Sequence, residues 1–553
     1  MAFFVGDPFY APAEDVRAEM NGRRLRGDAI QTFTPPSEDV FLQPGEIYAL
    51  TPQRRPEPGD VFAYRYRRTY VDPAYAPILK VPNVDRVERF EIAVRHPASV
   101  TAGFDVVTPR GGELHTVERR SDTETVLTFA DLSAADDLPL FPYNDAHASV
   151  RLQFDTEAGP ILPTDAPSFA AWYERLVEGA VPDTLSTSLQ AVAEGLRRET
   201  ERETVSAIHD HVRGSIRYVA DERAEGAFVP RAPDLVASRG YGDCKDRAFL
   251  VRALAAHLGI DVDVVLISTE AVPAFEGAHV FLYNHVINAH GEGDEAVYFD
   301  PTHRYVPFGS LPEGDVDGQA LRLGAEPAQV RVAAPEADPM LDVRITASLA
   351  APDAAEATVT VRGDLFGAVQ EAMAVGRRLD AENLLSGASG AFLYKIRLGY
   401  FEPVDVGETE ATFRAEADLS EFVVASPTRR YLPHTPFRAV PAETAERAND
   451  ALPVYTGWRP DARLVLDLDA GAWQAAPDSV AFGSPADAAH FAARLGASGE
   501  RTVIDYRFRQ RTRRFAGPDR DPYLAFADRY LGARRGMFIF RAAEAASTNE
   551  PAP

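Results

Sequence analysis

The spacing of hydrophobic and polar residues changes along the chain. In the first part, residues 61–66, 86–94 and 121–129 alternate between apolar and polar side chains, and Gly- and Pro-containing turns separate these runs. Further on, residues 169–176 and 185–213 keep apolar side chains at helical spacing. These patterns predict an N-terminal antiparallel β-sandwich that is followed by helices.

Apolar residues then cover nearly every side of the helix that residues 248–258 would form. Such a pattern is typical of a helix buried inside a domain. Asp243 is a good N-cap residue, and Gly259 would end the helix.

Three β-like runs follow this helix, at residues 262–269, 280–288 and 296–302. His285 lies in the middle of the second run, and Asp300 lies in the third. The helices and these strands together predict an α+β core in the centre of the chain.

Two Pro-rich segments, 157–167 and 325–339, bracket this central region. We therefore expect three parts: an N-terminal β-sandwich domain of unknown function (1–167), a central α+β domain (168–335) and a C-terminal β-rich region of one or two subdomains (336–553). The predicted fold class is multidomain α+β.

The C-terminal region contains both the alternating pattern of strands and the residue spacing of helices. Residues 341–362 alternate as strands do, and 412–424 also read as strand. Residues 365–385 are expected to form one helix, and 522–531 a shorter one.

Cys244 is the only cysteine among the 553 residues, and it lies just before the buried helix. In the first turn of a helix, unpaired backbone N–H groups and the positive end of the helix dipole stabilise a thiolate. A lone cysteine is also commonly a small buried hydrophobic residue. The cysteine alone leaves both interpretations open.

The order Cys244, His285, Asp300 supplies the three parts of a catalytic triad. In such a triad the imidazole activates the nucleophile and the carboxylate orients the imidazole. His285 could instead be a core histidine on a strand, and Asp300 could simply begin the turn at Pro301.

Several short motifs, in a fixed order, closely resemble those of the transglutaminase-like superfamily. They are Ile216–Val219, Phe228–Pro233, Arg239–Asp246, Leu258–Ile260, Asn284–Ile287 and Phe299–Thr302. The resemblance covers about residues 170–325 and is greatest to bacterial multidomain members in which a β-rich domain of unknown function precedes the core. It implies a papain-like α+β fold with Cys244 as nucleophile, His285 as general base and acid, and Asp300 as the residue that orients His285.

An oxyanion hole would complete such a site. The backbone N–H of Cys244 is the first expected donor, and a side chain from an upstream segment would supply a second. Tyr218 and Tyr241 are candidates by position, although each could equally be a packing residue.

Other chemistries find little support in the sequence. The net charge of −26 disfavours nucleic-acid binding. No Gly-rich phosphate-binding or dinucleotide-binding motif occurs. The pairs His209/His211 and His285/His290 lack the residue spacing of zinc sites. We therefore expect no metal and no cofactor.

No run reaches the roughly 20 apolar residues of a membrane span, and residues 1–8 lack the basic and apolar segments of a signal peptide. The chain as given is expected in the cytoplasm, or in the periplasm or outside the cell if it is part of a longer exported chain.

The sequence favours an enzyme in which Cys244 attacks an amide or peptide bond and forms a thioester, with a protein, peptide or glycopeptide as substrate. Hydrolysis and transfer to an amine would use the same residues. The alternative is a scaffold protein that binds a glycan or a protein and keeps the triad as a vestige.

Overall fold

The computed structural model describes most of the chain. The described residues are 2–6, 11–26, 29–33, 41–42, 46–52, 54–81, 86–108, 115–133, 148–182, 184–221, 224–269, 275–332, 339–374, 376–438, 454–455, 461–484, 488–498, 500–512, 514–515 and 517–542.

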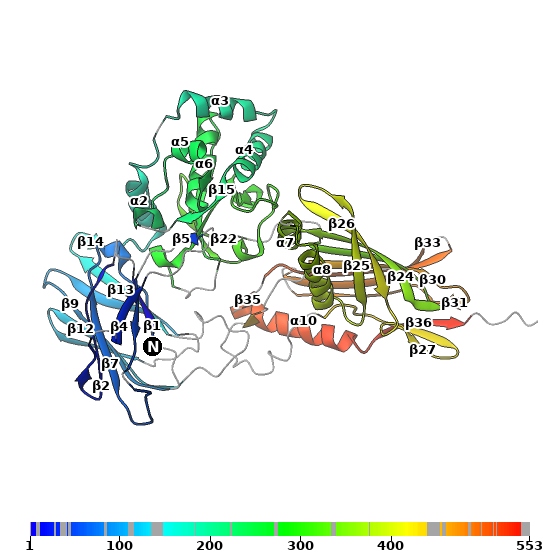
Figure 1. Cartoon of the computed structure of the whole chain (residues 1–553), viewed down its shortest axis with the longest axis horizontal. Helices are drawn as coiled ribbons and strands as arrows, with labels where there is room; N and C mark the ends of the chain where they lie inside the picture. Colours follow the sequence, from blue (N-terminus) through cyan, green and yellow to red (C-terminus); the bar gives the residue numbers. More distant parts are fainter. Residues whose placement is uncertain are drawn as a thin grey trace, which may run out of the picture. The chain divides into compact units, whose positions relative to one another are not determined.

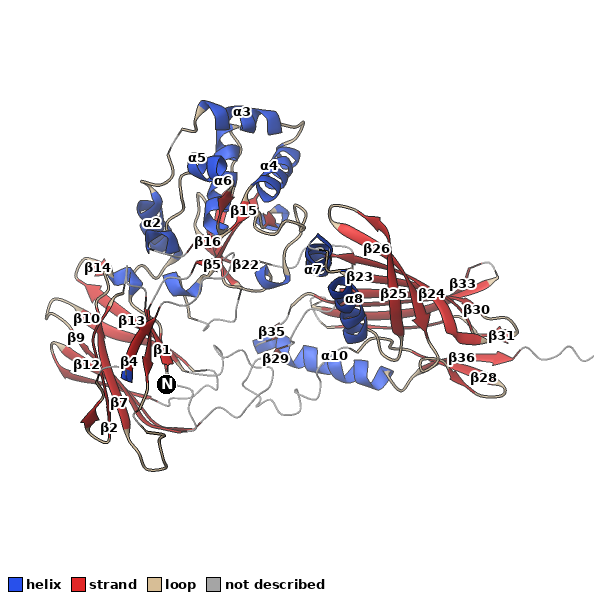
Figure 2. Ribbon diagram, viewed as in Figure 1, coloured by secondary structure: helices blue, strands red, loops and turns tan. Residues whose placement is uncertain are grey.

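The protein is a β-rich, multidomain α+β chain (Figures 1 and 2). It divides into two compact units, each made of several segments. The first unit contains residues 1–136, 142–304 and 318–332, and the second contains 137–141, 305–317 and 333–553. Within the described residues, no helix combines the length and the hydrophobicity needed to cross a lipid bilayer.

The N-terminal part of the first unit consists of short antiparallel sheets. One sheet has the order β11-β12-β9 and another the order β10-β13-β14, with β8 also paired to β13. Two further sheets have the orders β1-β6-β4 and β3-β2-β7. The strands are β1 (Ala2–Gly6), β2 (Ala13–Met20), β3 (Arg23–Arg24), β4 (Ile30–Phe33), β6 (Glu46–Leu50), β7 (Phe62–Arg68), β8 (Leu79–Lys80), β9 (Arg86–Arg95), β10 (Thr101–Val107), β11 (His115–Ser121), β12 (Glu124–Ser133), β13 (Ser149–Thr156) and β14 (Gly159–Pro160).

Apolar side chains from two of these sheets share one core. Ile92 and Val94 come from β9, Phe129 comes from β12, and Val150 comes from β13. Because alternate residues of each strand point into this core, the period-two pattern of the sequence is explained.

In its described residues, the rest of the first unit contains five α-helices and an antiparallel sheet of five strands. The strand order is β20-β19-β18-β21-β22. The elements are α2 (Ala166–Val177), α3 (Thr187–Leu196), α4 (Glu201–Ser215), α5 (Pro233–Arg239), α6 (Cys244–His257), β18 (Asp263–Ile267), β19 (His285–His290), β20 (Val297–Phe299), β21 (Gln319–Leu323) and β22 (Ala328–Arg331). Short parallel pairs join β15 (Arg217–Tyr218) to β17 (Tyr241–Gly242) and β16 (Ala220–Asp221) to β5 (Phe41–Leu42).

Helix α6 lies at the centre of this region, as its apolar sequence predicts. It contacts α3, α4 and α5 as well as β18 and β19 (Figure 1). Buried Asn288 on β19 fixes the register of helix and sheet, because its Nδ2 donates to the carbonyl oxygens of Ala248 (3.1 Å) and Asp263 (3.2 Å). The first residue of α6 therefore lies near the first residue of β19.

Two predicted elements of this region are wrong in detail. Residues 280–288 do not form one strand: a 3-10 turn, η4 (Val280–Leu282), precedes β19, and His285 is the first residue of that strand instead of its middle. His279 caps the turn by accepting from the N–H of Phe281. The expected helical run 185–213 is likewise divided between α3 and α4, because Thr200 begins a new helix with a capping box.

The second unit is built on a sheet of eight strands. The strand order is β25-β26-β24-β23-β30-β34-β33-β32. All neighbours are antiparallel except β23 and β30. The strands are β23 (Leu341–Ser348), β24 (Ala351–Arg362), β25 (Arg397–Val406), β26 (Glu410–Asp418), β30 (Asp461–Asp469), β32 (Asp478–Gly483), β33 (Ala489–Ser498) and β34 (Arg501–Gln510).

Helices and short strands complete the second unit. Phe366 of α7, Leu385 of α8 and Tyr530 of α10 are buried in one core with side chains of the large sheet. A smaller sheet has the order β27-β28-β36-β31, and β29 pairs with β35. The elements are α7 (Gly363–Ala374), α8 (Arg378–Phe392), α10 (Arg520–Ala533), β27 (Val424–Ala425), β28 (Arg429–Pro433), β29 (Val454–Tyr455), β31 (Trp473–Gln474), β35 (Arg514–Phe515) and β36 (Met537–Ala542).

The single helix predicted for residues 365–385 is two helices, α7 and α8. Gly376 lies between them with a φ of +73°, a conformation that ends helices and that other residues adopt only at a cost. The predicted boundary at residues 335–336 lies outside the described residues, so the three-part division stays a prediction.

Gly277 permits a close approach that shapes the loop before His285. Its φ is +85°, and a Cβ atom there would lie 2.1 Å from the carbonyl oxygen of Thr164. That oxygen also accepts from the N–H of Ala278 (2.6 Å). The loop therefore rests directly on the segment that leads into α2.

We predict that Gly277→Ala destabilises the protein more than Gly293→Ala. Gly293 has a φ of +56° and open space around it, so alanine there incurs only the left-handed backbone cost of about 1 kcal/mol. Alanine at 277 adds a backbone clash, for a total of about 3 kcal/mol. Urea unfolding of the two variants measures the difference, and equal losses would contradict the close approach.

Candidate active site

Helix α6 presents Cys244 in its first turn. Asp243 is the N-cap and accepts from the N–H of Asp246, whose side chain accepts in return from the N–H of Asp243. Arg231 holds Asp246 through its own backbone N–H and its guanidinium, both at 2.7 Å. This capping box fixes the helix at Cys244, which is half-buried.

His285 and Asp300 meet because β19 and β20 are adjacent antiparallel strands. The Nε2 atom of His285 lies 3.2 Å from Oδ2 of Asp300, whose side chain is fully buried. Thr302 donates to both carboxylate oxygens, from its N–H (2.8 Å) and from its hydroxyl (2.7 Å). The carboxylate is therefore held on three sides, and its plane is set by the turn that follows β20.

Cys244 and His285 line the same cavity, and the thiol contributes to raising the pKa of the imidazole. Because Nε2 of the ring faces Asp300, Nδ1 is the nitrogen left for the thiol. The structure thus brings together the three residues that the sequence singles out, with His285 between the thiol and the carboxylate.

The charges around His285 favour its protonated form. Burial alone would lower the pKa of His285, but the charge and hydrogen bond of Asp300, together with the hydrogen bond and charge of Cys244, raise it well above the usual value. Burial would raise the pKa of Asp300, and the His285 charge and hydrogen bond, with the Thr302 hydroxyl, lower it instead. The pair is therefore poised as imidazolium and carboxylate.

A cavity of about 310 Å³ opens beside the thiol. Cys244 and His285 both line it, and so does Tyr218. Tyr241 is exposed and, among the described residues, is not part of this lining. Of the two candidate oxyanion tyrosines, only Tyr218 lies at the cavity.

The backbone of the first turn of α6 also offers donors for an oxyanion hole. Within the described residues, the N–H groups of Cys244 and Lys245 have no hydrogen-bond partner, as expected for the first turn of a helix. These free donors belong to the same turn as the thiol, which is the geometry that an oxyanion hole requires.

Arg247 is a residue of the site that sequence reasoning missed. Its buried guanidinium donates to the carbonyl oxygens of Pro301 (2.8 Å), Thr302 (3.1 Å) and Ile216. Burial lowers its pKa to about 10, against the raising effect of the Asp300 charge. The available signal was an arginine directly before the apolar run 248–258, because a buried arginine needs several acceptors.

Lys245 forms a second buried ion pair beside the thiol. Its Nζ lies 2.6 Å from Oδ2 of Asp243, and both side chains are almost fully buried. Burial would lower the pKa of Lys245, but the charge of Asp243 raises it. Together with Arg231 and Asp246, the pair balances two positive charges against two buried negative ones at the start of α6.

The N-terminal part of the first unit supports the loop before His285. Buried Arg151 on β13 donates to the carbonyl oxygens of Glu276 (2.5 Å) and Ala278 (3.4 Å). Burial and the Arg151 charge lower the pKa of His279 to about 4, so its neutral ring can accept from the N–H of Phe281 (3.2 Å). Residue Phe281 lines the cavity.

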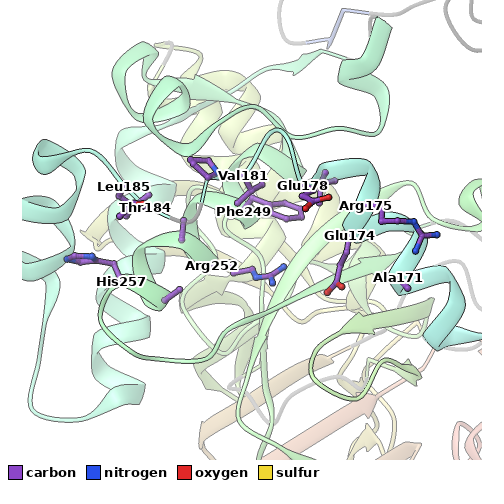
Figure 3. Close-up of a pocket in the computed structure, with 14 residues that line it drawn as sticks. Ala171, Glu174, Arg175, Glu178, Val181, Thr184, Leu185, Phe249, Arg252 and His257 are labelled. Atoms are coloured by element: carbon purple, nitrogen blue, oxygen red, sulfur yellow. The ribbon is translucent and has the colours of Figure 1, made fainter.

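A second cavity, of about 790 Å³, lies away from the triad (Figure 3). Its wall combines apolar residues such as Phe249 with charged side chains of α2 and α6, among them Glu174, Arg175 and Arg252. It contains neither a thiol nor any other group paired as Cys244 and His285 are, so the smaller cavity is the candidate active site.

The Asp300 carboxylate accepts from Thr302 twice and from His285. The donors present are those that orient an imidazole.

The comparisons with known proteins add a similarity of fold. The chain is similar to a crystal structure, at 2.00 Å resolution, of a protein from Parabacteroides distasonis described as a putative protease. The TM-score is 0.54 at 11% sequence identity, and the similarity covers 98% of this chain and 91% of that chain. No protein-family model matches the chain, and no curated protein matches its sequence significantly.

Asp300→Asn should destabilise the protein in a pH-dependent way. The raised pKa of His285 contributes stability that is complete below about pH 6.5 and is lost as the pH rises through the raised value. The lowered pKa of Asp300 contributes above about pH 4 and is lost as the pH falls. The difference in the free energy of unfolding between wild type and Asp300→Asn should therefore be largest at about pH 5 to 6.

Urea unfolding between about pH 3 and pH 10 measures this difference. Asp263→Asn is the matched control, because its partner Arg322 keeps its charge over the whole range. Its effect should not decline on the alkaline side. If the Asp300→Asn effect is equally flat there, the ion pair with His285 does not form.

Proposed function

We propose that the chain is a cysteine-dependent enzyme of the transglutaminase-like superfamily that acts on amide or peptide bonds. The single observation that carries the proposal is that Cys244 and His285 line one cavity while Asp300 holds the Nε2 side of the imidazole. The resemblance of the motifs around these residues supports it, and so does a fold shared with a protein described as a putative protease.

In the first half of the reaction, Sγ of Cys244 would attack the carbonyl carbon, so that a C–S bond forms. The free N–H of Cys244 would stabilise the negative oxygen of the tetrahedral intermediate. The C–N bond then breaks, and the His285 imidazolium gives its proton to the leaving amine. A thioester remains on Cys244.

In the second half, His285 would take a proton from water or from an acceptor amine, which attacks the thioester and releases the thiol. Water gives hydrolysis and an amine gives transamidation, with the same residues in the same roles. Asp300 would keep Nδ1 of the imidazole directed at the reacting atoms in both halves.

The triad roles are tested by acylation with S-methyl thioesters of N-acetylated amino acids, followed as a mass increase of the intact protein. Cys244→Ala should give no adduct, because no other thiol exists in the chain. His285→Ala should be nearly as severe, and Asp300→Ala should slow acylation by roughly 10²- to 10⁴-fold. An adduct on Cys244→Ala would refute the cysteine mechanism.

His290→Ala is the matched control for His285→Ala. It removes a histidine from the same strand, β19, at a position that binds the Asp261 carbonyl and does not line the cavity. It should acylate at the wild-type rate. Circular dichroism of each variant checks that the fold is kept.

Thiol labelling distinguishes the enzyme from the scaffold alternative. If Cys244 is the nucleophile of the proposed triad, iodoacetamide should label it at about pH 6 faster than it labels glutathione. His285→Ala should remove that advantage. Labelling of wild type at the glutathione rate would favour a scaffold with a vestigial triad.

A further inference from the structure

Aromatic side chains form much of the wall of the cavity beside Cys244. Besides Tyr218, rings from three segments line it: Phe169 and Tyr173 from α2, Phe228 from the segment before α5, and Phe281 and Tyr283 from the segment before β19. The rings pack on one another, with centroids 5.9 Å apart for Phe169 and Tyr283 and 6.1 Å apart for Phe228 and Phe281. The wall thus contains two pairs of packed aromatic rings.

The polar atoms of this wall are engaged elsewhere. The hydroxyl of Tyr173 donates to the carbonyl oxygen of Phe228 (3.2 Å), and that of Tyr283 is hydrogen-bonded to Gln329. The Asn284 amide is paired with Thr269. A ligand would therefore contact the rings and carbon atoms of these side chains, and not their polar atoms.

The charged residues of the wall are also paired. Lys245 and Asp243 bind each other at 2.6 Å, so the cavity offers no unpaired charge from them. The nucleophile and the imidazole beside the aromatic wall are those of Cys244 and His285. A ligand would thus meet one reactive edge and one apolar wall.

Cys244 itself packs against the hydrophobic cluster that contains Phe169 and Tyr173. In a thioester intermediate the acyl group stays bonded to Sγ while the amine leaves, so the acyl side must occupy the space around this sulfur. A volume of about 310 Å³ exceeds what a small side chain would fill, and packing voids are costly.

We propose that this cavity is the acyl-side specificity pocket and that the enzyme prefers substrates with an aromatic or large aliphatic side chain next to the reacting carbonyl. This inference rests on the proposed function of Cys244. Burial of such a side chain against the rings would contribute to transition-state binding, since aromatic contacts and apolar area both favour it.

The test compares acylation by the S-methyl thioesters of N-acetylphenylalanine and N-acetylglycine. Their small, common leaving group cannot fill the pocket, and reaction of each with glutathione corrects for intrinsic reactivity. After this correction, wild type should acylate with the phenylalanine compound at least about tenfold faster.

A tryptophan placed in the cavity should abolish the preference. Ala227 lines the cavity at a half-exposed position of a 3-10 turn, so Ala227→Trp would occupy the space of the acyl side chain. Ala253→Trp is the matched control, because Ala253 lines the other cavity. The control should keep the wild-type ratio of the two rates.

Each outcome is decisive. If neither thioester acylates wild type while iodoacetamide still labels Cys244, the proposed function fails. If both acylate with equal corrected rates, the function stands and the aromatic preference is overturned. A preference that survives Ala227→Trp in folded protein would place the specificity elsewhere. Should Ala227→Trp not fold, Phe281→Ala removes one ring of the wall and should lower the ratio.

Discussion

The contact between a buried helix and an antiparallel sheet is the constraint on which the candidate site depends. Helix α6 is apolar on nearly every side, so only contact with other elements all around it stabilises it. Asn288 then selects one register among the many that apolar packing alone would allow, because its amide must reach two particular carbonyl oxygens. In that register the first residues of α6 and β19, Cys244 and His285, face each other.

The site also contains several buried charged residues. Asp300, Asp243, Asp246, Lys245 and Arg247 are almost fully buried, which is costly unless each charge finds a partner. Two local networks of ion pairs and hydrogen bonds offset this cost, one at the start of α6 and one at the turn after β20. Arg247 belongs to the helix yet binds the turn, so helix and turn are fixed by the same residue.

Local signals predicted part of this arrangement from the sequence. The helix after Asp243 and the strand before Asp300 follow from capping chemistry and apolar patterning, which act over a few residues. The strand at His285 was misplaced because Val280–Leu282 is apolar in sequence but turns as a 3-10 helix, capped by His279. The support of the loop by Arg151 joins residues 125 or more positions apart, and no local pattern records such a contact.

The contact between the β-rich segment and the loop before His285 limits how freely either segment could be exchanged. Arg151 on β13 holds the carbonyl oxygens of Glu276 and Ala278, and the Tyr75 ring packs at a tilt against Phe228 with ring centroids 5.1 Å apart. The β-rich segment thereby forms an outer layer of the cavity wall. A recombination event that exchanged this segment for an unrelated one would keep the triad residues but lose the brace behind the wall. The two segments are therefore expected to have evolved as one inheritable unit, even though a Pro-rich stretch separates them in the sequence.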